Sequence, residues 1–145
     1  MKKPITQLEQ LTLNNASKTF LREIATWARF FSIIGFVFMA LLLVFAFFAI
    51  PIFKMATKLQ PGVPDNLGVV ILVTNVLIVI IYFFPTYYLW QFSTHMKKAL
   101  STKNDEILAT SFEKLKSNYK FIGVLTIITL SLYLLFFGAA IMGLL

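Results

Sequence analysis

Three long apolar runs constrain the fold of this chain more than any other feature. Residues 30–53 and 67–90 each form a run of 24 residues without a charged side chain, and residues 121–145 form a third run of 25. Because an α-helix rises about 1.5 Å per residue, each run reaches roughly 36 Å, enough to cross a ~30 Å hydrocarbon layer with some tilt. The sequence therefore predicts an all-α membrane protein with three transmembrane helices.

Composition supports a lipid environment. The 145 residues are 59% hydrophobic and 13% charged, whereas a soluble domain has roughly 45–50% apolar and about 25% charged residues. The net charge of +7 would suit nucleic acid if it formed a basic face on a folded domain, but all 13 lysines and arginines lie between or before the apolar runs. That distribution is typical of membrane proteins, so we expect no nucleic-acid partner. The chain has no cysteine, which excludes disulfides and thiolate chemistry.

The distribution of basic residues predicts the orientation. Residues 1–29 carry five lysines and arginines, residues 54–66 carry two, residues 91–120 carry six, and the final run carries none. Because basic residues stay on the cytoplasmic side, we expect the N-terminus and the 91–120 segment inside and the C-terminus outside. Aromatic and basic side chains near the predicted inner boundary are the expected membrane-interface residues: Trp27, Arg29, Tyr87, Tyr88, Trp90, Lys97, Lys98, Tyr119 and Lys120.

The segments outside the apolar runs differ in character. Residues 1–14 show no clear period and are expected to be a mobile tail. In residues 15–29 an apolar arc opposes basic side chains, which predicts an amphipathic helix. This helix either lies in the membrane interface or simply prolongs the first span and packs against its neighbours. Residues 54–66 contain two prolines and a glycine and form a short outer loop.

Residues 91–120 predict a cytoplasmic helical hairpin. The second span is expected to continue as a helix until a break near residues 101–103, after which Asn104 can cap a new helix that runs on into the third span. Apolar residues recur at spacings of three and four on both arms. The stripes either pack against each other or form a docking surface for a partner, for which the candidates are Phe92, Met96, Leu108, Phe112 and Leu115.

Nothing in the sequence points to catalysis. An enzyme needs a nucleophile with a base, a pair of carboxylates or a set of metal ligands. The single histidine, His95, lies near the inner boundary beside two lysines, and all six acidic residues lie outside the apolar runs. We therefore expect no catalytic site, no metal site and no cofactor.

Polar groups inside the apolar runs predict helix packing. The strongest is Asn75 in the second run. We expect the third span to pack on the second and Tyr133 to hydrogen-bond with Asn75, with a pore-lining role as the competing interpretation. One face of the third run carries small and polar residues: Gly123, Thr126, Thr129, Tyr133 and Ala140.

Two further features of the spans concern helix geometry. Ala139 and Gly143 form a small-xxx-small step that permits close helix contact. Pro85 is expected to bend the second span, because it removes one backbone hydrogen bond.

Several short motifs resemble a known family. They are the run Tyr82-Phe83-Phe84-Pro85-Thr86-Tyr87-Tyr88-Leu89, Phe92-Ser93, Met96-Lys97-Lys98-Ala99-Leu100, Phe112 with Leu115-Lys116, Lys120-Phe121-Ile122-Gly123, and Trp27-Ala28-Arg29-Phe30. From about Phe20 onward the chain resembles a family of small bacterial membrane proteins catalogued as a domain of unknown function. The resemblance implies a location in the bacterial inner membrane and no enzymatic activity.

Together these features favour a non-enzymatic protein. Three spans with short loops offer little interior for a substrate path but much lateral surface. We expect an accessory or scaffold subunit of a larger membrane complex, or a homo-oligomer, with the lipid bilayer and other membrane proteins or further copies of the chain as partners. A small oligomeric channel or transporter is the first alternative, and a membrane enzyme is the second.

Overall fold

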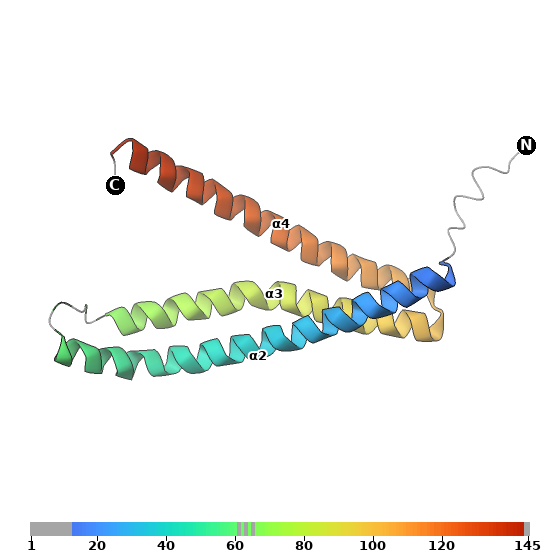
Figure 1. Ribbon diagram of the computed structural model, residues 1–145, viewed down its shortest axis with the longest axis horizontal. Helices are drawn as coiled ribbons and strands as arrows, with labels where there is room; N and C mark the ends of the chain where they lie inside the picture. Colours follow the sequence, from blue (N-terminus) through green and yellow to red (C-terminus); the bar gives the residue numbers. More distant parts are fainter. Residues whose placement is uncertain (1–12, 61, 63, 65, 144–145) are drawn as a thin grey trace, which may run out of the picture.

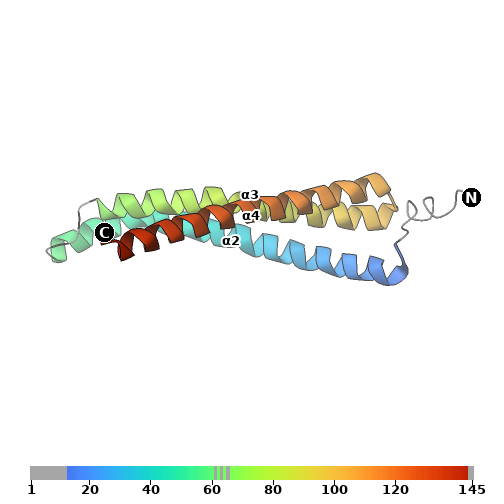
Figure 2. The same cartoon turned by 90° about the horizontal axis from the view of Figure 1, so that it is seen from above.

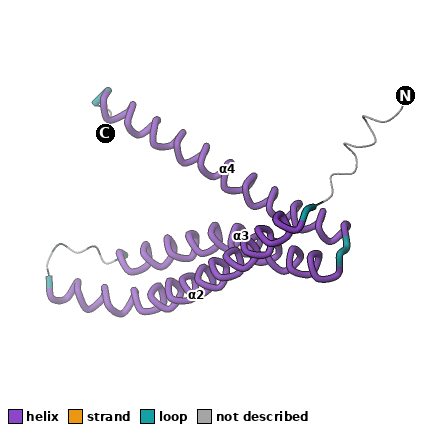
Figure 3. The backbone as a smooth tube through the Cα atoms, turned by 45° about the vertical axis from the view of Figure 1, so that its right-hand side comes forward, coloured by secondary structure: helices purple, strands orange, loops and turns teal. Residues whose placement is uncertain are grey.

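The described residues of this computed structural model, 13–60, 62, 64 and 66–143, form three long helices. These are α2 (Asn15–Leu59), α3 (Leu67–Thr102) and α4 (Asp105–Ile141), and Figure 3 shows no other regular element in this part of the chain. Each helix is long and apolar enough to cross a membrane. The chain thus has the three helices of an integral membrane protein, as the sequence predicts. The tail predicted over residues 1–14 lies almost entirely outside the described residues.

Helix α2 is one helix rather than two. The side chain of Asn14 caps it by accepting a hydrogen bond from the Ser17 amide at 2.7 Å. The helix then runs without a break through the predicted amphipathic segment. A separate amphipathic helix over residues 15–29 is therefore the wrong interpretation, and the alternative, that this segment prolongs the first span, is confirmed. No proline or glycine interrupts these residues, and a break would leave backbone groups unpaired. Pro51 does not end the helix either, which continues to Leu59.

The predicted hairpin consists of the ends of α3 and α4, not of additional helices. Helix α3 continues to Thr102, and Lys103 then adopts a left-handed conformation with φ 52°. Asn104 starts α4, because its side-chain oxygen accepts hydrogen bonds from the amides of Glu106 at 2.9 Å and Ile107 at 3.1 Å. We call this end of the molecule, where α3 turns into α4, the hairpin end.

Helices α2 and α3 form an antiparallel pair and lie side by side in Figures 1 and 2. Most of the buried residues of α2 are small, and they recur at spacings of three, four and seven, which fit the heptad period of a coiled-coil seam. They are Ala25, Ala28, Ser32, Met39, Ala46 and Ala49.

Two glycines show how closely these helices approach. A Cβ atom on Gly68 would lie 2.9 Å from the Cα of Ile50, and one on Gly35 would lie 2.8 Å from the Cγ2 of Thr86. Small residues along the seam therefore let the two backbones come together over most of their length.

Helix α4 leaves this pair. It packs on α3 at the hairpin end and then diverges, so that α3 and α4 form a V in Figure 1. No Cα atom of α4 lies within 8 Å of a Cα atom of α2. From Gly123 to Phe137 only Leu125 is even partly covered. We call residues 123–141 the α4 arm.

Candidate membrane interaction surface

A small core at the hairpin end holds the three helices together. Ala25 and Ala28 of α2 meet Phe92 and Met96 of α3, and leucines from all three helices surround them: Leu21, Leu89, Leu100, Leu108 and Leu115. The hydroxyl of buried Ser93 donates a hydrogen bond of 2.6 Å to the carbonyl of Ala25. Because this bond joins two helices, it fixes their rotation as well as their distance. This core sets the direction in which α4 leaves.

The core changes the interpretation of the predicted docking residues. Phe92 is 1% exposed and Met96 is fully buried, so neither is available to a partner. For these two residues the docking interpretation is wrong and the alternative, packing of the stripes on each other, holds. The hydroxyl of Ser111 packs against Met96, at 3.9 Å from its sulfur, and donates to the Leu108 carbonyl at 2.7 Å. The stripes of the two arms thus pack on each other. Of the five candidates only Phe112 is exposed.

Two side-chain amides at this end have buried oxygens without a hydrogen-bond partner. They are Oε1 of Gln91 on α3 and Oδ1 of Asn118 on α4. Asn118 is only 7% exposed. A buried acceptor without a partner costs about 1–3 kcal/mol. Asn118 lines the cavity between α3 and α4, so its unpaired oxygen weakens that interface.

The membrane-interface residues predicted on different helices lie at one level. The guanidinium of Arg29 on α2 stands 4.8 Å from the ring centroid of Trp90 on α3, a cation–π contact. Trp27 and Tyr119, from α2 and α4, line the same groove of about 700 Å³. Phe83 and Tyr87 stack with centroids 5.7 Å apart. An aromatic and basic belt at a single level is what a bilayer boundary requires.

The remaining interface candidates follow the same helices. Tyr88 is half-buried on α3, whereas Lys98 and Lys120 are exposed and Lys97 is partly covered. All four lie on the parts of α3 and α4 near the hairpin end. Lys120 adjoins Tyr119, whereas Lys97 and Lys98 follow Trp90 by seven and eight residues and so lie about 11 Å nearer the hairpin end.

A cavity of about 400 Å³ lies at the vertex of the V. Pro85 and Ile81 of α3 line it opposite Asn118 and Thr126 of α4, and Phe31 of α2 closes one side. Pro85 has no backbone N–H, so the carbonyl of Ile81 lacks its helical hydrogen bond. The vertex is thus where α3 and α4 stop packing, and polar groups on both walls are left incompletely paired there.

The structure does not bring Asn75 and Tyr133 together. Asn75 is half-buried and its amide donates to the Ile71 carbonyl at 2.9 Å. It follows Gly68 by seven residues, so it shares the face that packs on α2. Tyr133 lies on the α4 arm and is 69% exposed. The expected hydrogen bond between them is therefore wrong, because α3 turns Asn75 toward α2 and α4 has left α3 at that depth.

Tyr133 differs from Thr126 and Ser131 of the α4 arm in the pairing of its hydroxyl. The hydroxyls of Thr126 and Ser131 donate to carbonyls of their own helix at 2.8 Å. The Tyr133 hydroxyl stands at the end of a ring, too far out to do the same, and it has no hydrogen-bond partner among the described residues. It lies about 18 Å beyond Phe121 along the helix. A hydroxyl without a partner in hydrocarbon costs roughly 2–7 kcal/mol.

The other packing residues predicted on α4 are also unpaired. Gly123 is open, since a Cβ atom added there would meet nothing within 4 Å. Thr129 and Ala140 are exposed. The helix ends at Ile141, and Gly143 takes a positive φ of 68° beyond it. Ala139 and Gly143 therefore do not form a small-xxx-small step on one helix.

The described residues show no group of three or more acidic, histidine or cysteine side chains that could hold a metal ion. The ring of His95 lies 2.7 Å from the Gln91 carbonyl, so one of its nitrogens is engaged by its own helix.

The seam of α2 was not recognised in the sequence, although a signal was present. Alanine, serine and glycine recur at spacings of three and four from Ala25 to Gly35, and two further alanines, Ala46 and Ala49, continue the same face. In a run that is apolar on every side, small size rather than hydrophobicity marks the packed face.

Comparison with known proteins gives no match. No family model, no curated protein and no solved structure is similar to this chain. The resemblance to a family of small bacterial membrane proteins stays a prediction.

Proposed function

We propose that this protein is a non-enzymatic accessory or scaffold subunit of a membrane assembly, and that the α4 arm is its docking element. The α2–α3 pair is the rigid part, held by a seam of small residues. The core at the hairpin end anchors α4 to that pair, and the arm projects from it.

The observation that carries the proposal is the exposure of the α4 arm. Helix α4 lies away from α2 and diverges from the outer part of α3, and from Gly123 to Phe137 only Leu125 is partly covered. By contrast, α2 and α3 each have one face that packs against the other helix, although their outward faces are also apolar and exposed. The arm also carries an unpaired hydroxyl, that of Tyr133, at a depth where lipid offers no hydrogen bond. A partner helix along the arm would supply both the missing packing and the missing hydrogen bond.

We further propose that the protein lies in a bacterial inner membrane with the hairpin end in the cytoplasm. The asymmetry of basic residues supports this orientation. The belt that contains Arg29 and Trp90 marks the level of the inner boundary. A cysteine placed at Thr102 is then expected to be protected from an impermeant thiol reagent added to spheroplasts, and one placed at Gln60 is expected to react.

A small oligomeric channel is the second candidate. Thr126, Thr129 and Tyr133 lie on one side of the arm and would supply polar groups to a pore between copies. No charged residue lies on this arm, and transporters and proton relays usually carry ionisable groups inside the membrane. We therefore place the docking function first.

Photo-crosslinking in native membranes tests the docking function. A photoreactive phenylalanine analogue is placed at Phe136 on the arm, which is 61% exposed, and at Phe47 on the outer side of α2, which is 78% exposed. Both positions keep an aromatic ring in a lipid-facing environment. We expect Phe136 to give a protein adduct of one defined mass and Phe47 to give only lipid adducts. Lipid adducts alone at both positions would contradict the proposal.

A further inference from the structure

The exposed face of α4 that contains Tyr133 points to a specific occupant. Resting on the proposed docking function, we propose that the partner of the α4 arm is the α4 arm of a second copy of this chain, seated in the V. The contact face, which we call the Tyr133 face, consists of Thr126, Thr129, Tyr133 and Ala140.

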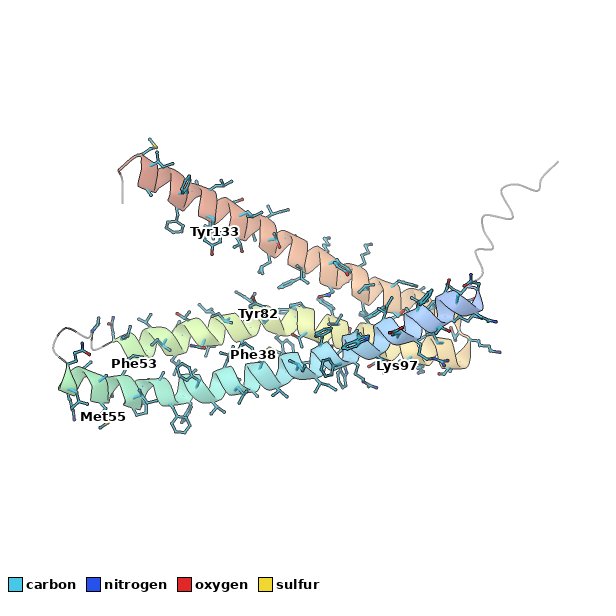
Figure 4. All side chains as sticks on the ribbon, in the orientation of Figure 1. Phe38, Phe53, Met55, Tyr82, Lys97 and Tyr133 are labelled. Atoms are coloured by element: carbon cyan, nitrogen blue, oxygen red, sulfur yellow. The ribbon has the colours of Figure 1, made fainter. Side chains whose placement is uncertain are left out.

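These four residues form a narrow stripe. At 100° per residue, Thr126, Thr129 and Ala140 all project within about 40° of Tyr133. Thr126 also lines the cavity at the vertex, so the stripe continues the α4 wall of that cavity toward the C-terminal end of the helix. Figure 4 shows Tyr133 on the side of α4 that is turned toward the α2–α3 pair. The Tyr133 face therefore forms one wall of the V.

The chemistry of Tyr133 fits a second copy. Most membrane homo-oligomers place copies in the same orientation, related by an axis along the membrane normal. Such an axis brings the same residue of two α4 helices to the same depth. A phenolic hydroxyl both donates and accepts a hydrogen bond, so one Tyr133 hydroxyl can donate to the other across the pair. A helix with only aliphatic residues at this depth would leave both the donor and the acceptor unpaired.

The area of the V also suits a symmetric pair. The arm is about 28 Å long, and one face about 10 Å wide gives roughly 280 Å² for each helix in a contact. Contact between the two arms alone would bury about 560 Å², which is small for a stable complex. An arm seated in the V also meets the partner's α3, and symmetry repeats that contact. The pair then has three contacts: one between the two α4 arms, and two between an arm and the α3 of the other copy. At about 560 Å² each they bury about 1,700 Å², which is the size of a stable interface.

The absence of cysteine makes the test direct, because each single-cysteine variant reports on one position. We place cysteine at Thr129 and at Ala140 on the Tyr133 face, and at Val124 and Leu135 on the opposite side of the helix. All four residues are exposed. The full-length variants are oxidised in native membranes at their natural expression level, and disulfide-linked dimers are measured.

The proposal predicts dimers from the first two positions and at least about a tenfold lower yield from the other two, because only the former share a face with their symmetry mates. Equal yields at all four positions would indicate random collision and overturn the proposal. Monomers at all four positions would overturn it as well.

Tyr133→Phe tests the role of the hydroxyl without removing the ring. We expect a 3- to 30-fold increase in the dimer dissociation constant in lipid, the effect of losing one hydrogen bond between membrane helices. Tyr119→Phe makes the same chemical change outside the apolar run and is expected to leave dimerisation unchanged. Equal dissociation constants for the Tyr133→Phe variant and the native chain would overturn the assignment of Tyr133 to the interface.

The experiments separate this proposal from the docking function on which it rests. If photo-crosslinking at Phe136 gives an adduct whose added mass differs from that of a second copy, the arm docks on another protein and only the self-association proposal fails. If Phe136 gives lipid adducts alone, both proposals fail.

Discussion

Replacing Gly68 by alanine tests the close packing of α2 and α3. The added Cβ would lie 2.9 Å from the Cα of Ile50 and 3.2 Å from the carbonyl oxygen of Ala49. Both are backbone atoms, so no side-chain rotation relieves the clash and the helices must separate by about half an ångström. Forcing an extra carbon into a packed interface costs typically 1–3 kcal/mol. The substitution also gains up to about 1 kcal/mol in helix propensity.

Gly138→Ala is the matched control, because the same substitution near the end of α4 meets nothing within 4 Å. The gain in helix propensity is common to both variants, so the difference between them measures the contact. We expect Gly68→Ala to be less stable than Gly138→Ala by about 1–3 kcal/mol. The free energy of unfolding is measured by SDS titration from mixed micelles, followed by circular dichroism. Equal stability of the two variants would refute the close approach of α2 and α3 at this point.

Three more substitutions test the hairpin end by the same assay. Ser93→Ala should destabilise the protein by about 0.6–2 kcal/mol, since the Ser93 hydroxyl bonds to another helix. Its control, Thr94→Val, removes a hydroxyl bonded to its own helix and should cost less. Equal losses of stability would argue against the inter-helix bond. Phe92→Ala should cost about 3–5 kcal/mol of stability, because it empties a buried site. Phe112→Ala, at an exposed position, should cost under about 1 kcal/mol. A larger loss for Phe112→Ala than for Phe92→Ala would contradict our assignment of the core. Asn118→Leu should be neutral or stabilising, because it removes an acceptor without a partner; a loss above about 1 kcal/mol would mean that the amide has a partner.

Much of the fold could be predicted from the sequence because it depends on local chemistry. Runs of 24 and 25 apolar residues identify the spans. The turn between α3 and α4 follows from Asn104, whose side chain caps the amides that a new helix leaves unpaired. These signals act within a few residues and need no knowledge of the partner helix.

The packing of the helices could not be predicted in the same way. Hydrophobic periodicity identifies a packed face only where the other face is polar, and inside the apolar runs both faces are apolar. The pairing of Asn75 with Tyr133 was therefore inferred from polarity and depth alone. The structure pairs α3 with α2 through small residues such as Ala46 and Gly68 instead. Steric fit between two backbones decides this choice.

The divergence of α4 has no counterpart in the sequence pattern. The apolar run of α4 is as long as that of α3, and its small residues suggest packing. The split begins at the vertex, where Pro85 frees the Ile81 carbonyl and Asn118 lacks a partner. These two features weaken the α3–α4 interface at the vertex. Because one lies on α3 and the other on α4, their combined effect cannot be predicted from the pattern of either helix alone.

Helix α4 is held at the hairpin end only and projects from the α2–α3 pair as an arm. Distances between pairs of spin labels in a lipid bilayer test it most directly, since cysteines can be introduced freely into this chain. One pair joins Lys98 and Ala109 at the hairpin end, and the other joins Val73 of α3 and Leu135 of the arm; excess unlabelled protein suppresses distances between copies. We expect a short, narrow distance distribution for the first pair and a clearly longer one for the second. Equally short and narrow distributions for both pairs would show that α4 packs along α3 over its whole length and would contradict the account.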